Sequence, residues 1–140
     1  MALRFLLDTN VLSEPLKPRP DTSVMARLKQ HERSLCTAAL VWHELAFGAA
    51  RLPDGAKKRA IEAYLHDVVT PTVPLLAYDG AAASWHASER ARLVASGKTP
   101  PFVDGMIASV ARVNGLILVT NNVADYAAFD GIEVERWHER

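Results

Sequence analysis

Residues 4–10 of the chain read RFLLDTN, a short apolar run that ends abruptly in Asp8. Two small hydrogen-bonding residues, Thr9 and Asn10, follow this acid. The run is typical of a buried first strand with Asp8 at its carboxyl end. Because ligands of open α/β sheets bind at that edge, Asp8 is a candidate for chemistry or for cation binding. The alternative is that Asp8 only caps the next helix, since Asp is a favoured N-cap residue.

Length and composition are those of an ordinary globular protein, with 140 residues, 49% hydrophobic and 23% charged. This length predicts one domain over residues 1–140. No apolar run reaches the roughly 18 residues needed to cross a bilayer, and no signal peptide is recognisable. A single cysteine, Cys36, excludes an internal disulfide and fits a reducing compartment. We therefore expect a cytoplasmic protein with no membrane partner.

The charge balance limits how the chain could hold a nucleic acid. It has 16 basic and 16 acidic residues and a formal net charge of zero, unlike a strongly basic nucleic-acid binder. A polyanionic substrate would therefore need a local basic patch or bound metal ions. Basic residues cluster at 57–59, at Arg90, Arg92 and Lys98, and at Lys17 and Arg19. These clusters are either an RNA path or ordinary solvated helix faces, and the sequence leaves both open.

Strand-like and helix-like segments alternate along the chain, which predicts an α/β fold with a mainly parallel sheet. The expected strands are residues 3–7, 34–37, 72–77, 116–119 and 132–135. The expected helices are a short one ended by Pro15, one capped by Asp21 or Thr22, and residues 38–51, 57–68, 79–97 and 103–114. The helix at 38–51 is almost entirely apolar, which indicates burial on most sides. In the helix at 57–68, Ile61, Tyr64, Leu65 and Val68 are expected on one side.

Three further acids lie in similarly apolar surroundings. Glu44 shares a helix face with Leu40 and Phe47, where an uncompensated charge is costly to desolvate. Asp104 begins a helix, and Asp125 closely follows the strand at 116–119. Each also has a simpler role: for Glu44 a buried ion pair with an arginine or an end of the apolar stripe that reaches solvent, for Asp104 balance of the helix dipole, and for Asp125 an ordinary loop position.

The four acids are more informative together than singly. The first and fourth strands would bring Asp8 and Asp125 to one sheet edge. Carboxylates that converge on one crevice repel each other, and one of them takes up a proton unless cations bind between them. Oxygen ligands without Cys or His indicate Mg²⁺ or Mn²⁺. Such ions would hold a phosphate and assist an in-line displacement, so the residues predict phosphodiester hydrolysis.

Four blocks of the sequence resemble PIN-domain ribonucleases, in particular VapC-type toxins and their FitB-like relatives. The blocks are residues 7–15 (LDTNVLSEP), 40–48 (LVWHELAFG, with a Glu-Leu-x-x-Gly pattern), 104–108 (DGMIA) and 118–125 (LVTNNVAD). The resemblance covers essentially the whole chain, including the terminal Trp137. It implies a single PIN domain with a three-layer fold around a mainly parallel sheet of about five strands.

The same resemblance implies a Mg²⁺- or Mn²⁺-dependent endoribonuclease toxin of a toxin–antitoxin system. Its catalytic and metal-binding acids correspond to Asp8, Glu44, Asp104 and Asp125. Its supporting polar residues correspond to Thr9, Asn10, Thr120 and Asn121. The partners it implies are an RNA substrate, a small VapB-type antitoxin from the same operon and a second copy of the chain in a homodimer. Several members of the family cut tRNA.

Two other functions remain open from the sequence. One is a non-catalytic interaction module of the same fold, in which the acids serve partner binding or stability. The other is a phosphohydrolase of the haloacid-dehalogenase type with Asp8 as nucleophile, but such enzymes need a second aspartate where this chain has Asn10. A zinc-protease site at His43 lacks its second histidine, because Phe47 occupies that position.

Overall fold

The computed structural model describes residues 2–139 and contains one five-stranded sheet with the strand order β3-β2-β1-β4-β5. Every pairing between neighbouring strands is parallel. The strands are β1 (Phe5–Leu7), β2 (Leu35–Ala38), β3 (Leu75–Leu76), β4 (Ile117–Val119) and β5 (Glu133–Glu135). The prediction of an α/β fold with a parallel sheet of about five strands is confirmed.

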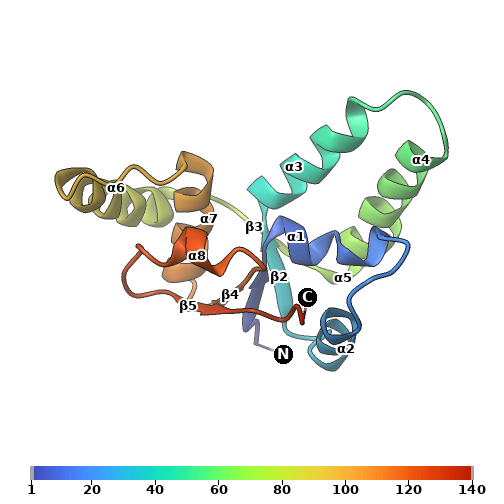
Figure 1. Ribbon diagram of the computed structural model, residues 1–140, viewed down its shortest axis with the longest axis horizontal. Coiled ribbons are helices and arrows are strands. Elements are labelled where there is room, and N and C mark those ends of the chain that lie inside the picture. The colour runs from blue at the N-terminus through green and yellow to red at the C-terminus, as the bar shows by residue number, and fades with distance from the viewer. Residues whose placement is uncertain (1, 140) are drawn as a thin grey trace.

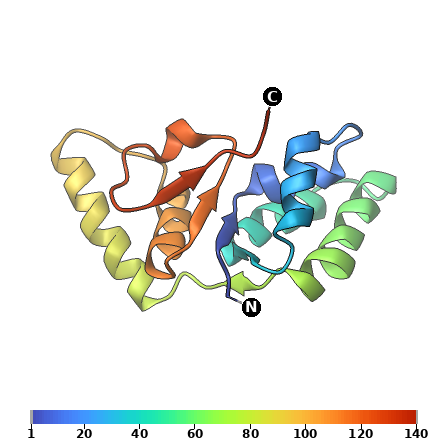
Figure 2. The same cartoon turned by 90° about the horizontal axis from the view of Figure 1, so that it is seen from below.

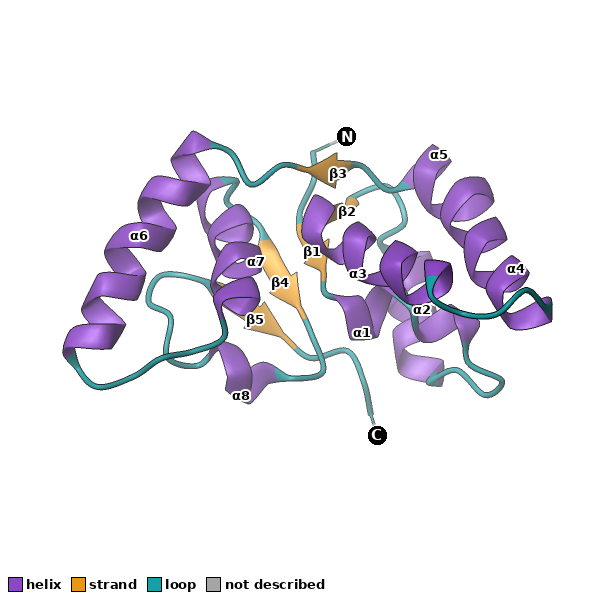
Figure 3. Ribbon diagram, turned by 90° about the horizontal axis from the view of Figure 1, so that it is seen from above, coloured by secondary structure: helices purple, strands orange, loops and turns teal. Residues whose placement is uncertain are grey.

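Helices cover both sides of this sheet. They are α1 (Thr9–Leu12), the 3₁₀ helix η1 (Glu14–Leu16), α2 (Thr22–Gln30), α3 (Ala39–Ala50), α4 (Ala56–Ala63), the π-helix η2 (Tyr64–Val69), α5 (Thr70–Thr72), α6 (Gly80–Ala95), α7 (Phe102–Val113) and α8 (Val123–Tyr126). Figure 1 shows α1 to α5 on one side of the sheet and α6 to α8 on the other. Figures 2 and 3 show the same three layers from below and from above.

Strand β1 lies at the centre of the sheet and sets the position of the candidate site. Its three residues are buried, as expected for an apolar strand covered on both faces. Leu7 pairs with Thr37 of β2 and with Val119 of β4. The carboxyl ends of β1 and β4 therefore meet, and residues 8 and 120 follow the strands side by side. Behind this edge the core includes Trp137, whose ring packs on Phe5.

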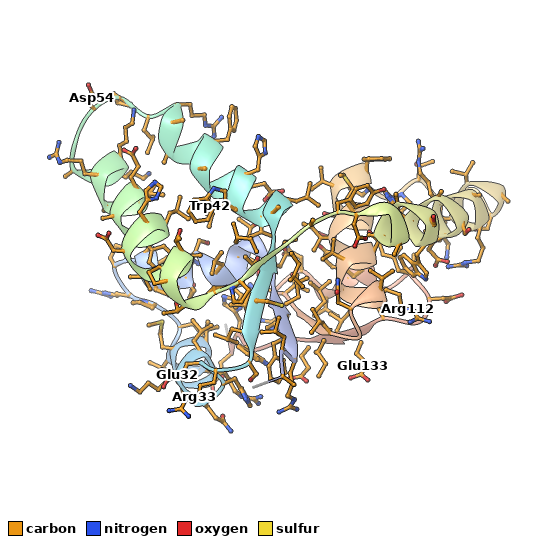
Figure 4. All side chains as sticks on the ribbon, turned by 180° about the vertical axis from the view of Figure 1, so that it is seen from behind. Glu32, Arg33, Trp42, Asp54, Arg112 and Glu133 are labelled. Carbon is orange, nitrogen blue, oxygen red and sulfur yellow. The ribbon has the colours of Figure 1, made fainter. Side chains whose placement is uncertain are left out.

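Two predictions about helix faces are wrong. Only Val41 and Ala49 of α3 are buried, because α3 packs along one side and projects with α4 as a pair of helices (Figure 4). In the next helix Val68 is 50% exposed, and Val69 is buried in its place. The segment is a π-helix there, and its wider turn moves the apolar face by one residue.

The prediction that Pro15 ends a helix is also wrong, because Pro15 lies inside η1.

Aspartates cap α2 and α6, and the cap predicted at Asp21 is confirmed. Asp21 accepts hydrogen bonds from the backbone N–H groups of Ser23 and Val24. Asp79 accepts one from the backbone N–H of Ala82 at the start of α6. Within residues 2–139, none of the helices combines the length and the apolar character that a membrane span requires.

Candidate active site

Asp8 is buried directly after β1, and both of its carboxylate oxygens are engaged. Oδ1 accepts a hydrogen bond from the backbone N–H of Thr9 at 2.8 Å, so Asp8 does cap α1. Oδ2 accepts hydrogen bonds from the hydroxyls of Thr120 at 2.9 Å and Tyr126 at 3.2 Å. A cap of a helix as short as α1 (Thr9–Leu12) needs only the first contact. The other two bonds fix the orientation of the carboxylate itself.

Thr120 is the centre of a small polar network beside Asp8. Its side chain is completely buried, and its hydroxyl accepts hydrogen bonds from the backbone N–H of Asn122 at 3.0 Å and from Nδ2 of Asn10 at 3.3 Å. Oδ1 of Asn10 in turn accepts from the backbone N–H of Asn121 at 2.8 Å. The network ties the loop after β4 to the first turn of α1. Asn121 contributes through its backbone, since its own buried Oδ1 has no hydrogen-bond partner among residues 2–139.

Glu44 lies on the exposed side of α3, so it is not buried in the apolar stripe, and the alternative that this part of the stripe reaches solvent is the one observed. Its Oε2 accepts a hydrogen bond from the Thr9 hydroxyl at 2.6 Å. Through the backbone and the hydroxyl of Thr9, the positions of Asp8 and Glu44 are therefore linked. No Lys, Arg or His of the described chain forms an ion pair with Glu44, so the buried ion pair considered above is absent as well.

Asp104 and Asp125 complete the group of acids. Asp104 lies half-buried in the first turn of α7, and Asp125 lies exposed in the first turn of α8. Burial, followed by the charges of Asp8, Asp125 and Glu44, raises the pKa of the Asp104 carboxyl to about 6. A carboxylate that only balanced a helix N-terminus would have its pKa lowered. Burial, together with repulsion from the other three acids, therefore outweighs the helix dipole at Asp104.

The nature of these side chains fits a hard divalent cation. All four offer carboxylate oxygens, which Mg²⁺ and Mn²⁺ prefer, and none forms an ion pair with a basic residue of the described chain. No three His, Cys, Asp or Glu side chains within residues 2–139 are already gathered closely enough to enclose an ion. The acids thus share one electrostatic field without forming a closed cage. Of the four acids, Glu44 and Asp125 are exposed.

Tyr126 belongs to this site, although the sequence drew attention only to its neighbour Asp125. Its ring is buried and its hydroxyl donates to Asp8. Burial and the charges of Asp8, Asp104 and Glu44 raise the pKa of Tyr126, so the hydroxyl keeps its proton and remains a donor. The sequence carries no signal for this contact, since an aromatic residue after a strand is most often part of the core.

Gly105 lets α7 pack closely against α6 next to Asp104. A Cβ atom at Gly105 would lie 2.3 Å from Nε2 of His86, a side chain of α6. His86 is buried, and its Nδ1 shares a hydrogen bond with the Tyr78 hydroxyl at 2.9 Å. The imidazole therefore has little freedom to move away. This contact fixes the distance between α6 and the turn of α7 that carries Asp104.

Comparisons with known proteins agree with this geometry. The family model of the PIN domain matches residues 5–130. The chain is 33% identical to "tRNA(fMet)-specific endonuclease VapC" of Shigella flexneri over 96% of this chain and 98% of that protein. It is 32% identical to "Toxin FitB" of Neisseria gonorrhoeae over 96% and 99% of the two chains. A crystal structure of DNA-bound VapBC from Salmonella typhimurium superposes with a TM-score of 0.82 at 28% identity, covering 96% of this chain and 98% of the other.

Proposed function

Since the chain belongs to the PIN domain family, among the VapC-type and FitB-like toxin ribonucleases, we propose that it is a Mg²⁺- or Mn²⁺-dependent endoribonuclease that hydrolyses RNA phosphodiester bonds. One observation carries the proposal. Acids that follow β1 or lie on α3, α7 and α8 come close enough that the charges of Asp8, Asp125 and Glu44 add to the effect of burial and raise the pKa of Asp104 to about 6. Such mutual repulsion is characteristic of carboxylates arranged for cations.

The acids of the site would have different roles in this reaction. Asp8 is held in one orientation by hydrogen bonds from the Thr9 backbone and from the hydroxyls of Thr120 and Tyr126. The Thr9 hydroxyl orients Glu44. Asp104 loses its proton above a pH of about 6 and is charged at neutral pH. A divalent cation bound by these acids would offset the phosphate charge and activate water for attack at phosphorus.

We propose three partners on the strength of the relatives. The Shigella relative is named for cleavage of tRNA(fMet), so tRNA is the first substrate to test. The Salmonella structure is a VapBC assembly, and a VapB-type antitoxin is the inhibitor we expect. A homodimer of this chain is the third expectation, and it rests on the resemblance alone.

The proposal is tested with purified protein, free of any inhibitor, and a pool of tRNA and single-stranded RNA. We expect cleavage with Mg²⁺ or Mn²⁺, none with EDTA, and at least a hundredfold loss in Asp8→Asn. Glu133→Gln is the matched control, because Glu133 is an exposed acid at the start of β5, away from the carboxyl edge (Figure 4). Cleavage that ignores EDTA or survives Asp8→Asn contradicts the mechanism. No cleavage of any RNA would favour the non-catalytic interaction module.

A further inference from the structure

Helix α3 carries an exposed row of aromatic and basic side chains beside the acidic site. His43, Phe47 and Arg51 are spaced four residues apart, which places them along one line of the helix surface. The rings of His43 and Phe47 stack with centroids 6.1 Å apart and planes 15° from parallel. The Arg51 guanidinium lies 5.5 Å from the centre of the Phe47 ring. At 57%, Phe47 is the most exposed of the large hydrophobic side chains within residues 2–139.

The row borders a cavity that contains one of the four acids. Glu44 is three residues from Phe47 and therefore its neighbour on the helix. A cavity of about 340 Å³ between α3 and α4 is lined by Glu44, Gly48, Arg51 and Lys57, among others. Trp42, labelled in Figure 4, lies on the side of α3 that faces α4 and packs on His66. The α3–α4 pair thus has a packed side and an open, partly basic side that continues to Glu44.

Gly48 is a second, independent feature that favours ligand binding at this face of α3. Glycine inside a helix costs about 1 kcal/mol relative to alanine. Apart from its chain neighbours and the backbone of its own helix, no atom of residues 2–139 lies within 4 Å of the position that a Cβ of Gly48 would take, so no packing contact there requires a glycine. Gly48 lies four residues after Glu44, on the same face, and lines the same cavity. A residue without a side chain leaves this wall of the cavity open to a ligand.

We propose that this face of α3 is a nucleotide-binding subsite for single-stranded RNA, next to the phosphate held by the acids. A base would stack on Phe47 beside His43, and Arg51 and Lys57 would contact the backbone phosphates. Aromatic rings bind bases by stacking with little sequence preference. Because the chain as a whole has no net charge, such local cations are needed to hold a polyanion at an acidic site. The proposal rests on the ribonuclease function proposed above and names how its substrate is held.

Affinity for RNA tests this subsite without any cleavage. The probe is a fluorescein-labelled single-stranded RNA 12-mer, titrated with Asp8→Asn protein in Mg²⁺ and followed by fluorescence anisotropy. In this background, Phe47→Leu should weaken binding at least about tenfold, toward the lower end of the range for one base stacked on an aromatic ring. Phe47→Trp should stay within twofold of the parent, because it keeps a stacking surface. Gly48→Leu should weaken binding by filling the cavity.

The controls separate stacking from loss of structure and from protein contacts. Val94→Ala removes part of a 52% exposed apolar side chain on α6, on the other side of the sheet from α3 (Figure 1), and should change nothing. Melting temperatures of both Phe47 variants should match the parent. Equal affinities for Phe47→Leu and Phe47→Trp would overturn the proposal, as would a parent that binds no RNA. A Phe47→Leu variant that keeps RNA affinity but loses self-association in sedimentation would also overturn it and mark a protein interface. Binding as expected by a wild-type protein that never cleaves would contradict only the catalytic function.

Discussion

The hydroxyl of Tyr126 donates a hydrogen bond to Oδ2 of Asp8 at 3.2 Å, from the short helix that follows the strand paired with β1. Hydrogen bonds to charged groups contribute about 1.5–3 kcal/mol. Tyr126→Phe removes this donor and keeps the ring, so we expect it to destabilise the fold by about 1–2 kcal/mol in urea unfolding. Cleavage should also fall, because Asp8 loses one of its fixed orienting contacts.

A double-mutant cycle shows whether this effect acts through Asp8. In an Asp8→Asn background there is no carboxylate charge left to stabilise, so Tyr126→Phe should cost clearly less than in the wild type. Equal costs in both backgrounds would mean that the hydroxyl stabilises the protein independently of Asp8.

Asp104→Asn should separate activity from stability. At pH 7 without metal, the substitution removes one of four repelling charges, so the melting temperature should stay the same or rise by roughly 2–5 °C. Solvent screening at this half-buried position keeps the gain to about 1 kcal/mol. Cleavage should be lost. The measurement is a thermal scan in EDTA, with Glu133→Gln as the unaffected control. A large fall in melting temperature would identify Asp104 as a structural helix residue instead.

The pH dependence of that difference follows from the raised pKa of Asp104. In the folded state the Asp104 carboxyl keeps its proton up to a pH of about 6, whereas the ordinary pKa of an aspartate is 3.8. The contribution of Asp104 to folding is therefore most favourable below pH 3.8 and is lost as the pH rises through about 6. The stability advantage of Asp104→Asn should accordingly be small near pH 4 and reach its full size above pH 6.5. Urea unfolding in EDTA across this range measures it, and a constant difference would show that folding does not raise the pKa of Asp104.

Gly105→Ala tests the packing that supports Asp104. The new methyl group would meet His86 at 2.3 Å, and overpacking of this kind costs about 1–3 kcal/mol. His86→Ala should relieve the clash, so the double variant should lose less stability than the sum of the two single variants. Strict additivity would mean that α7 shifts away from α6 without resistance.

Much of this fold follows from short apolar runs. The FLL run of β1 and the ILV run of β4 are typical of buried parallel strands, and because the two strands pair in parallel their carboxyl ends share an edge. Asp8 and Thr120 follow these strands directly and are hydrogen-bonded to each other in the structure. The sequence also indicated the helix that starts near Asp104. The features of the fold that follow from strand order and residue spacing were therefore predictable from the sequence.

The environment of Glu44 was not predictable in the same way. Helix α3 is apolar around most of its circumference, so the sequence does not show which side meets the rest of the protein. That choice depends on the packing of α4, which is followed by a π-helix from Tyr64. A π-turn has no reliable sequence signature. The hydrogen bond from Tyr126 to Asp8 was not predictable for a related reason. The two residues lie far apart in the sequence, and such a contact depends on the whole fold.

The central position of β1 has a consequence for synthesis of the protein. Translation delivers Asp8 among the first residues and Thr120 and Tyr126 among the last, while β4 is needed to complete the pairing on one side of β1. A nascent chain on the ribosome therefore holds an unsupported carboxylate and lacks half of the candidate site. We expect no hydrolysis until the polypeptide is nearly finished. The ribosome that makes this chain would thus be spared its activity during elongation.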